Sequence, residues 1–278
     1  MAVITVSRGT MSGGMALAEC LANHLGYPVL SREVLVKAAE KLGVSEDMLR
    51  GKVERSAGFW ERMTSNRRIY LIALQSALAD AAVGGDLVYH GHAGHLLLAD
   101  LPTVLRVRVI APMAMRIREA MKRNGLDYNG AKEHIRIMDM ERVRWTKFVY
   151  GLNWSDPKNY DLVINLGTIS IANACAVIAA AARLPVYATT DDVKKKLRDF
   201  ALACRVKVAL AANIHSRAIS FDVTADSGKV EIFAETASVG VPMARPGPEA
   251  EDIELIAKTV EGVNGVRVDL RLYPQYGE

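Results

Sequence analysis

The sequence predicts an α/β fold for the first part of the chain and a small α+β region after it. Two observations support this prediction. Short apolar runs rich in β-branched residues alternate with stretches of helical periodicity as far as Arg183, and such alternation is typical of a parallel sheet flanked by helices. Beyond Pro185 the order changes to helix, two strands, helix and strand. The chain has 278 residues, half of them apolar, so it can bury a substantial core.

The first region should form a five-stranded parallel sheet, because each apolar run is followed by a segment long enough to cross back as a helix. The predicted strands cover residues 2–6, 27–30, 86–90, 103–111 and 160–166. The predicted helices cover residues 15–25, 32–42, 66–83, 112–124, 131–148 and 170–183.

The second region should run from residue 187 to 278, which leaves residues 1–186 for the first domain. The segment "RLPVYATTDD" interrupts the alternation with a proline and then offers Thr190 and Asp191 as helix caps. The elements predicted after it are a basic helix (191–203), two strands (218–225 and 229–236), a helix (250–261) and a last strand (266–272). The glycine of "DSG" suits a hairpin, so we expect antiparallel pairing in this module.

The charge distribution favours a small anionic ligand. The net charge is +4, and residues 1–185 hold 23 lysines and arginines against 17 acidic residues, while the remainder hold 12 against 14. Nucleic-acid binding usually demands a denser basic stripe, so we expect no nucleic-acid partner. The three cysteines fit neither a disulfide framework nor a metal site. No apolar run has the length of a membrane span and no leader pattern is visible, so we expect a cytoplasmic protein.

A glycine-rich turn, "SRGTMSGG" over residues 7–14, joins the first predicted strand to the first predicted helix. In such turns backbone N–H groups converge on an anion, while a lysine and a Ser/Thr hydroxyl serve the outer phosphates and Mg²⁺. Here the lysine position of GxxxxGK[ST] falls on Met15 and the hydroxyl position on Ala16, so the P-loop is degenerate. A purely structural turn that closes a helix onto a sheet explains the glycines equally well. The residues that could hold a nucleotide's phosphates are Ser7, Arg8, Gly9, Ser12, Gly13 and Gly14, with Arg8 in place of the lysine charge.

Several segments, in order along the chain, resemble the cytidylate kinase-like family, a branch of the P-loop nucleoside monophosphate kinases. They are "ITVSRGTMSGGMALAECLANHLGYPVLSRE", "GHAG", "LPTVLRVRVIAP" and "DPKNYDLVINLG". The resemblance covers roughly residues 2–183. It implies a five-stranded parallel sheet with flanking helices, a nucleoside monophosphate site, a lid over the triphosphate, and the use of ATP and Mg²⁺. The family's own loop commonly lacks the lysine.

Arginines are the candidate catalytic groups, because phosphoryl transfer requires positioning and charge neutralisation more than acid–base chemistry. The segment "DMER" (139–142) resembles the family's lid, which implies that two arginines reach the phosphates and two lie at the stem of the lid. A solvated helix face, in which Arg116 pairs with Glu119, explains part of the same pattern. The four candidates are Arg142 and Arg144 on the lid, and Arg116 and Arg123 at its stem.

Substrate contacts are expected from His90, His92 and Arg32. "YHGHAGH" (89–95) ends a predicted strand, at the sheet edge where ligands bind in open parallel sheets. By resemblance His92 replaces a family arginine, and His90 lies where related kinases often place an acid. Arg32 could bind the acceptor phosphate. The histidine spacing also suggests zinc, but no further ligand is evident, so no metal site is predicted and packing or substrate contact is favoured.

The second region resembles a BON domain over roughly residues 189–273, on the segment "VEGVNGVRVDL". This resemblance implies an unidentified partner, with a phospholipid surface as one option, although an ordinary buried sheet explains the same alternation. Two functions follow. The chain is either a cytidylate-kinase-like phosphotransferase that moves the γ-phosphoryl of ATP to a nucleoside monophosphate, or a catalytically inactive nucleotide-sensing protein whose BON-like domain binds a partner or surface. The missing lysine, hydroxyl and acid favour the second function. The preferred base and the oligomeric state stay open.

Overall fold

The computed structural model describes residues 2–31, 64–99, 101–213, 219–237 and 250–273, together with Val34 and Ser216. Its main feature is a five-stranded sheet of order β2-β3-β1-β4-β5, in which every neighbouring pair is parallel. The strands are β1 (Val3–Arg8), β2 (Val29–Ser31), β3 (Leu87–His90), β4 (Val104–Ile110) and β5 (Leu162–Asn165). The fold class predicted for the first region is therefore confirmed.

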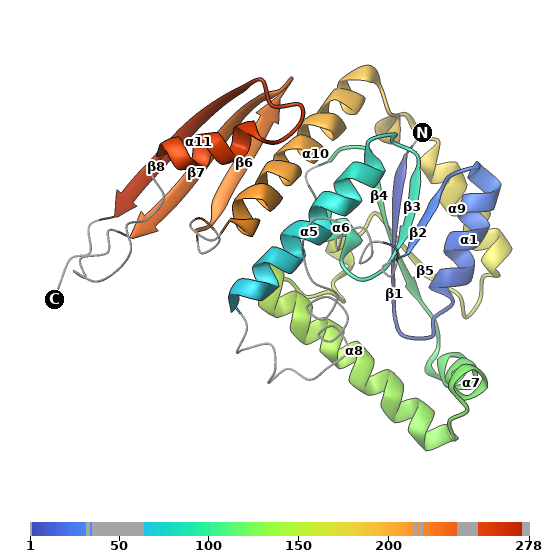
Figure 1. Ribbon diagram of the computed structural model, residues 1–278. Helices are drawn as coiled ribbons and strands as arrows, with labels where there is room; N and C mark the ends of the chain where they lie inside the picture. The colour runs from blue at the N-terminus through green and yellow to red at the C-terminus, as the bar shows by residue number, and fades with distance from the viewer. Residues whose placement is uncertain are drawn as a thin grey trace.

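Helices cover both faces of this sheet (Figure 1). Alternate residues of β1 divide between two cores: Val3 packs with the α5 side, while Ile4 and Val6 pack with α1 and α9. Small residues such as Ala18 and Ala179 let the helices of the second core approach the strands closely. The helices of this part are α1 (Gly14–Leu25), α5 (Thr64–Ala82), α6 (Gly94–Leu97), α7 (Met113–Asn124), α8 (Tyr128–Tyr150) and α9 (Ile171–Ala182). Two single-turn 3-10 helices are η1 (Pro157–Asn159) and η2 (Pro185–Tyr187).

Two helices are longer than the sequence predicts. Helix α8 has the side chain of Asp127 as its N-cap and ends at Gly151 in a left-handed conformation. Helix α10 (Asp191–Ala212) starts at the predicted cap, Thr190, but continues nine residues past the predicted end at residue 203. The extension is buried between neighbouring elements, and this tertiary packing sustains the helix beyond its basic segment. The predicted helix 32–42 lies outside the described residues, except for Val34.

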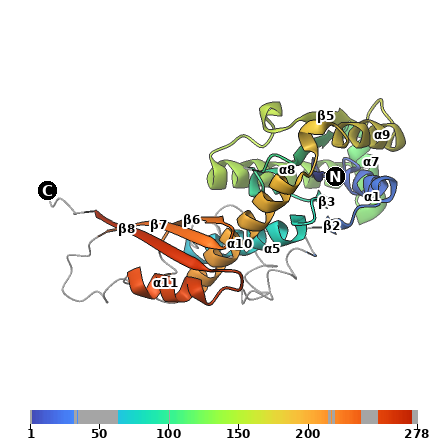
Figure 2. The same cartoon turned by 90° about the horizontal axis from the view of Figure 1, so that it is seen from above.

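The second region is a three-stranded sheet of order β6-β7-β8 with α11 on one face (Figure 2). Its elements are β6 (Phe221–Asp226), β7 (Lys229–Ala237), α11 (Ala250–Lys258) and β8 (Gly265–Tyr273). Strands β6 and β7 form the expected hairpin, and Ser227 and Gly228 both have positive φ, as its two-residue turn requires. The expectation of antiparallel pairing throughout is wrong, because β8 pairs with β7 in parallel. A helix between two strands lets the chain cross over and return in the same direction.

Helix α10 belongs to both parts of the molecule. It packs against α5 on the side of the large sheet and against β6 and α11 on the side of the small sheet. Leu197 lies in the core of the first part, whereas Val206 and Leu210 lie in the core of the second. Within the described part of the chain, no single helix is long and apolar enough to cross a membrane, while the bent pair Ile171–Ala182 and Pro185–Ala212 passes by length and composition only.

Candidate functional site

The glycine-rich loop lies between β1 and α1, at the carboxyl edge of the large sheet. Gly13, the N-cap of α1, has a φ of 84°, and a Cβ there would lie 2.9 Å from Leu166. A Cβ on Gly14 would lie 2.5 Å from the stem of Arg8, which packs over it. Among the residues that the structure describes, no acceptor is found for the N–H groups of Gly13 and Gly14. This is the usual state of a helix N-terminus, and it is suited to an anion.

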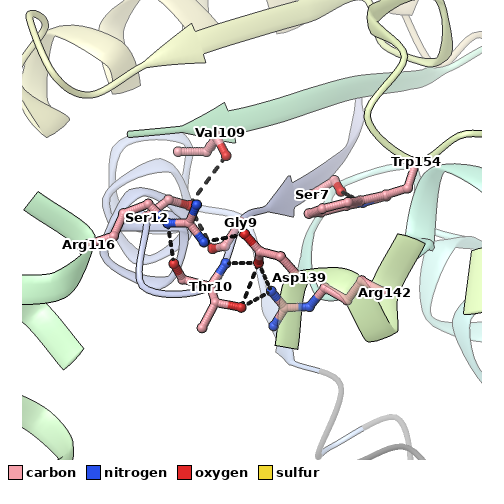
Figure 3. Close-up of polar contacts among 9 residues, drawn as sticks. All are labelled: Ser7, Gly9, Thr10, Ser12, Val109, Arg116, Asp139, Arg142 and Trp154. Carbon is pink, nitrogen blue, oxygen red and sulfur yellow. Dashed lines mark hydrogen bonds and ion pairs between the residues drawn. The ribbon is translucent and has the colours of Figure 1, made fainter. Parts of the chain in front are cut away.

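Asp139 of α8 is bound to the loop (Figure 3). Its Oδ1 accepts hydrogen bonds from the backbone N–H of Thr10 at 2.9 Å and from the Thr10 hydroxyl at 2.8 Å. Arg116 of α7 forms an ion pair with Oδ2 and donates from Nε to the Thr10 carbonyl at 2.7 Å. Arg142, one turn further along α8, donates from Nη1 to the Thr10 hydroxyl at 2.5 Å and lies 3.3 Å from Oδ1 of Asp139. The carboxylate of Asp139 thus accepts a hydrogen bond from a loop N–H group and forms ion pairs with two arginines.

The surroundings of Asp139 keep it ionised. Burial alone would raise the pKa of this carboxyl, but the Thr10 N–H, the Arg116 guanidinium and the Thr10 hydroxyl outweigh burial and hold the pKa below its ordinary value of 3.8. A carboxyl with a depressed pKa stabilises the fold above its unfolded pKa, and that contribution is lost as the pH falls through the folded pKa. The contact between α8 and the loop is therefore fully charged at neutral pH.

The two serines of the loop segment face inward. Ser12 donates its hydroxyl proton to the Gly9 carbonyl at 2.8 Å, with the Val109 carbonyl at 3.3 Å, and so braces the loop against β4. Ser7 accepts a hydrogen bond at 2.9 Å from the indole Nε1 of Trp154. Both hydroxyls are engaged by protein groups in this arrangement.

An aromatic cluster lies beside the loop, where the segment after α8 crosses β1 and β4. The Tyr160 hydroxyl donates to the Trp154 carbonyl at 2.9 Å and lies 3.3 Å from Oγ of Ser7. Arg108 of β4 donates from Nη1 to the same carbonyl at 2.5 Å, and its guanidinium lies 4.2 Å from the centroid of the Trp154 ring. The ring of His95 lies 4.6 Å from the ring of Tyr160.

His92, which follows the end of β3, contacts α8. Its ring contacts the rings of Trp145 and Trp154 at centroid distances of 4.8 and 5.8 Å. Its Nε2 lies 3.1 Å from the hydroxyl of Thr146. That hydroxyl donates its proton to the Arg142 carbonyl, so Nε2 of His92 carries the hydrogen of this contact. His92 therefore contributes to the position of Arg142.

A cavity of about 190 Å³ opens between the loop, the end of β4 and α8. Arg108, Arg116 and Asp139 are the charged residues on its walls. The other lining residues are Gly9, Ser12, Ile110, Ala111, Met140, Val143, Trp154 and Ser155. The space combines apolar walls with guanidinium groups at the edge where open parallel sheets bind ligands.

The structure brings together only part of the predicted set. Arg116 and Arg142 meet at the loop. Arg123 forms an exposed pair with Glu119 at the far end of α7, and Arg144 is exposed on α8. His90 is buried at the end of β3, and Arg32 lies outside the described residues. For all of them a role in binding or catalysis stays a prediction.

Two residues of the site were not among the predicted site residues. Asp139 was seen only as part of "DMER", because a carboxylate is not expected to contact a phosphate loop. Arg108 was treated as part of a strand. A signal was present in "VLRVRVI", because two arginines two residues apart in a buried strand lie on one face of the sheet. Arg106 forms a pair with Asp161, whereas Arg108 is 8% exposed and faces the cavity.

Comparison with known proteins agrees with this geometry. Residues 3–168 match the family described as cytidylate kinase-like. The chain belongs to the cytidylate kinase-like family. Its membership and its P-loop kinase-like sheet mark it as a kinase-like, nucleotide-binding protein. The matched residues include the loop, Arg108, Arg116, Asp139 and Arg142.

Relatives with known names match the first part of this chain. A cytidylate kinase of Ignicoccus hospitalis is 29% identical over 168 residues, which are 59% of this chain and 90% of that protein. A cytidylate kinase of Methanopyrus kandleri is 25% identical over 184 residues, which are 64% of this chain and 92% of that protein. The crystal structure of an uncharacterized protein from Eubacterium ventriosum covers 65% of this chain and 97% of its own, with a TM-score of 0.53 and 23% identity, and so shows the fold alone.

Kinases of this kind use Mg²⁺ in general, and the residues at the loop do not fit a protein-built site for it. The position that would offer a hydroxyl is Ala16. Asp139, the acid among the lining residues that the structure describes, is held by Thr10 and by arginines. Among the described residues no group of three or more His, Cys, Asp or Glu could hold a metal ion. The positive charges on the described wall of the cavity are those of Arg108 and Arg116.

His95 should make the fold sensitive to mild acid. Burial, with smaller contributions from Arg106 and Arg108, lowers the pKa of His95 from 6.5 to about 4. As the pH falls, the unfolded chain binds the proton before the folded chain does. The free energy of unfolding therefore has its full value above pH 6.5 and declines as the pH falls toward 4, by on the order of 3 kcal/mol. Urea unfolding at pH 7 and pH 4.5 measures this loss. A His95→Phe variant is expected to lose less than the wild type, whereas a His24→Gln variant, changed at an exposed site on α1, should match the wild type. Equal losses in the wild type and the His95→Phe variant would contradict the assignment.

Proposed function

We propose that this protein is a cytidylate-kinase-like phosphotransferase that moves the γ-phosphoryl of ATP to a nucleoside monophosphate through a degenerate P-loop. One observation carries the proposal: Arg116 and Arg142, from two different helices, meet at Thr10 of the glycine-rich loop. Phosphoryl transfer needs positioned positive charge around the transferring group more than acid–base groups. Two guanidinium groups at the loop supply positive charge that the lysine position, occupied by the exposed Met15, does not.

The arrangement supports a division of labour at the phosphate site. The N–H groups at the start of α1 would hold the phosphates of ATP. Arg116 and Arg142 would neutralise the charge that develops on the transferring group. The acceptor would enter at the end of β3, beside His90 and His92, with Arg32 as a further contact for its phosphate. The relatives named cytidylate kinase support a nucleoside monophosphate as the acceptor.

A second candidate function is a nucleotide sensor without turnover. The observation that favours it is the carboxylate of Asp139 on the Thr10 N–H, because this contact competes with a phosphate for the loop. In that case the second region, for which we propose a BON-like fold, would pass the nucleotide state to a partner or a phospholipid surface. The contacts of α10 with α5 and with β6 offer a physical link between the two parts.

A coupled assay of the purified protein with ATP, Mg²⁺ and a panel of nucleoside monophosphates tests the proposal. The expected result is turnover with at least one monophosphate, with a pyrimidine monophosphate the first to try. Thermal unfolding with and without each nucleotide is measured in parallel. Nucleotide-dependent stabilisation without any turnover would overturn the enzyme and favour the sensor. If the protein shows neither stabilisation nor turnover, both candidate functions are overturned.

A further inference from the structure

Arg108 is a buried cation beside the glycine-rich loop, and no carboxylate of the described residues pairs with it. Its side chain is 8% exposed, and Nη1 donates to two neutral oxygens, the Trp154 carbonyl at 2.5 Å and the Tyr160 hydroxyl at 3.4 Å. The ring of Trp154 at 4.2 Å offers a cation–π contact. No acid within ion-pair distance of Arg108 is found in the described part of the chain. A charge that is buried without a counter-ion is costly, so its retention calls for a ligand.

Arg106, an arginine on the same strand, has its charge neutralised by a carboxylate, as a structural role requires. It lies two residues before Arg108 on the same face of β4, and Asp161 accepts from its Nε at 3.2 Å and from Nη2 at 2.6 Å. Arg108 has no equivalent partner within the ranges that the structure describes, and its positive charge, together with that of Arg106, contributes to the low pKa of His95. The two arginines therefore differ in electrostatic environment, although they share a strand and a face.

The position of Arg108 identifies the ligand class. Arg108 is the register partner of Ser7, the residue two positions before the first glycine of the loop. It lines the same cavity as Gly9, Ser12 and Arg116. Asp139 is the acid among the described lining residues of that cavity, and it is already bound to Thr10 and to arginines. A guanidinium group offers planar donors that suit the oxygens of a phosphate group.

We propose that Arg108 is a phosphate-binding residue, which supplies from β4 the positive charge that the loop lacks at Met15. The inference rests on the proposed nucleotide site at the loop. It adds one residue and one element to that site, and it assigns the cavity to a phosphate group of the bound nucleotide. Arg108 would then bind the nucleotide from β4, whereas Arg116 and Arg142 reach the loop from α7 and α8.

Titration with inorganic triphosphate, followed by calorimetry and by the intrinsic tryptophan fluorescence, tests this assignment without any need for turnover. Arg108→Gln is expected to weaken triphosphate binding by about 10- to 100-fold, the usual effect of losing a charge-assisted hydrogen bond. Arg106→Gln is the matched control, and its affinity should stay within about threefold of the wild type because its partner is Asp161. Equal affinities in the wild type and Arg108→Gln, or equal losses in both variants, would overturn the proposal. So would a wild-type protein that does not bind triphosphate.

A purely structural role for Arg108 is separated by thermal unfolding. If Arg108 only anchors the segment around Trp154, Arg108→Gln lowers the melting temperature of the anion-free protein and keeps the full increase on adding triphosphate, which contradicts the proposal. A phosphate-binding role predicts a smaller increase. Should Arg108→Gln fail to fold, Arg108→Met carries the same test, because an apolar side chain of similar length often replaces a buried ion without loss of stability.

The failure of this inference is distinguishable from the failure of the proposed function. Triphosphate binding that depends on Arg108, in a protein that phosphorylates no monophosphate, supports the inference and contradicts the proposed kinase activity. Turnover that is unchanged in Arg108→Gln supports the kinase and removes the inference.

Discussion

Replacing Arg142 by alanine is expected to lower kcat for phosphoryl transfer by about 10²- to 10³-fold, the usual effect of removing one preorganised electrostatic donor. Arg142 is 19% exposed, and its guanidinium contacts the Thr10 hydroxyl and Asp139 at the loop. Its position is fixed by α8, which Thr146 and His92 fasten to the end of β3. The coupled assay at saturating ATP and monophosphate measures the change.

Arg136→Ala is the matched control for this prediction. Arg136 lies on the same helix, is 59% exposed and pairs with Glu133. Its removal should leave kcat within about threefold of the wild type, since surface ion pairs contribute little. Circular dichroism confirms that both variants are folded. Similar kcat values for Arg142→Ala and Arg136→Ala would mean that Arg142 does not act on the transferring group.

Replacing Asp139 by asparagine is expected to tighten binding of inorganic triphosphate by about 10- to 100-fold, because hydrogen bonds to a charged group are worth roughly 1.5–3 kcal/mol. In the wild type a phosphate must displace a carboxylate that holds the Thr10 N–H, Arg116 and Arg142. The neutral amide keeps the shape of the side chain and competes less well for the two arginines. The low pKa of Asp139 keeps this competition present at all ordinary assay pH values.

Glu133→Gln serves as the control for Asp139→Asn. It removes a carboxylate from the same helix at an exposed position, so it changes the net charge equally without touching the loop. Its triphosphate affinity should stay close to that of the wild type. Unchanged or weaker binding in Asp139→Asn would contradict competition, and would instead indicate that Asp139 positions Arg116 and Arg142 for the nucleotide.

Much of the large sheet could be predicted from the sequence, because its signals are local. Each strand is a short apolar run, and each connection is long enough for a crossover helix. The glycines of the loop are likewise local, since Gly13 needs a left-handed backbone and Gly14 lies under the stem of its neighbour Arg8. The parallel pairing of β8 was not predicted, because strand direction depends on how the chain crosses between two strands.

The candidate site could be predicted only in part. Arg116 and Arg142 were predicted from a basic segment that resembles a lid. Which arginines reach the loop depends on the faces that α7 and α8 present. The sequence pattern does not distinguish Arg123 and Arg144 from the two arginines that reach it. The same limit applies to His92, whose contacts with Trp145, Trp154 and Thr146 no sequence pattern indicated, and whose contact with the substrate stays a prediction.

The sequence by itself determined the order of strands and helices, the turn that exposes N–H groups at the start of α1, and the surplus of arginines available for an anion. These features depend on backbone conformation and periodicity within a few residues. Only the tertiary structure decided that Asp139 accepts a hydrogen bond from the Thr10 N–H. It also decided that Arg106 pairs with Asp161, whereas Arg108 is buried beside the loop with the Trp154 carbonyl as its hydrogen-bond acceptor. Such choices depend on contacts between residues about 50 to 130 positions apart, because burial and the distance between charges set their energies and no local pattern records either.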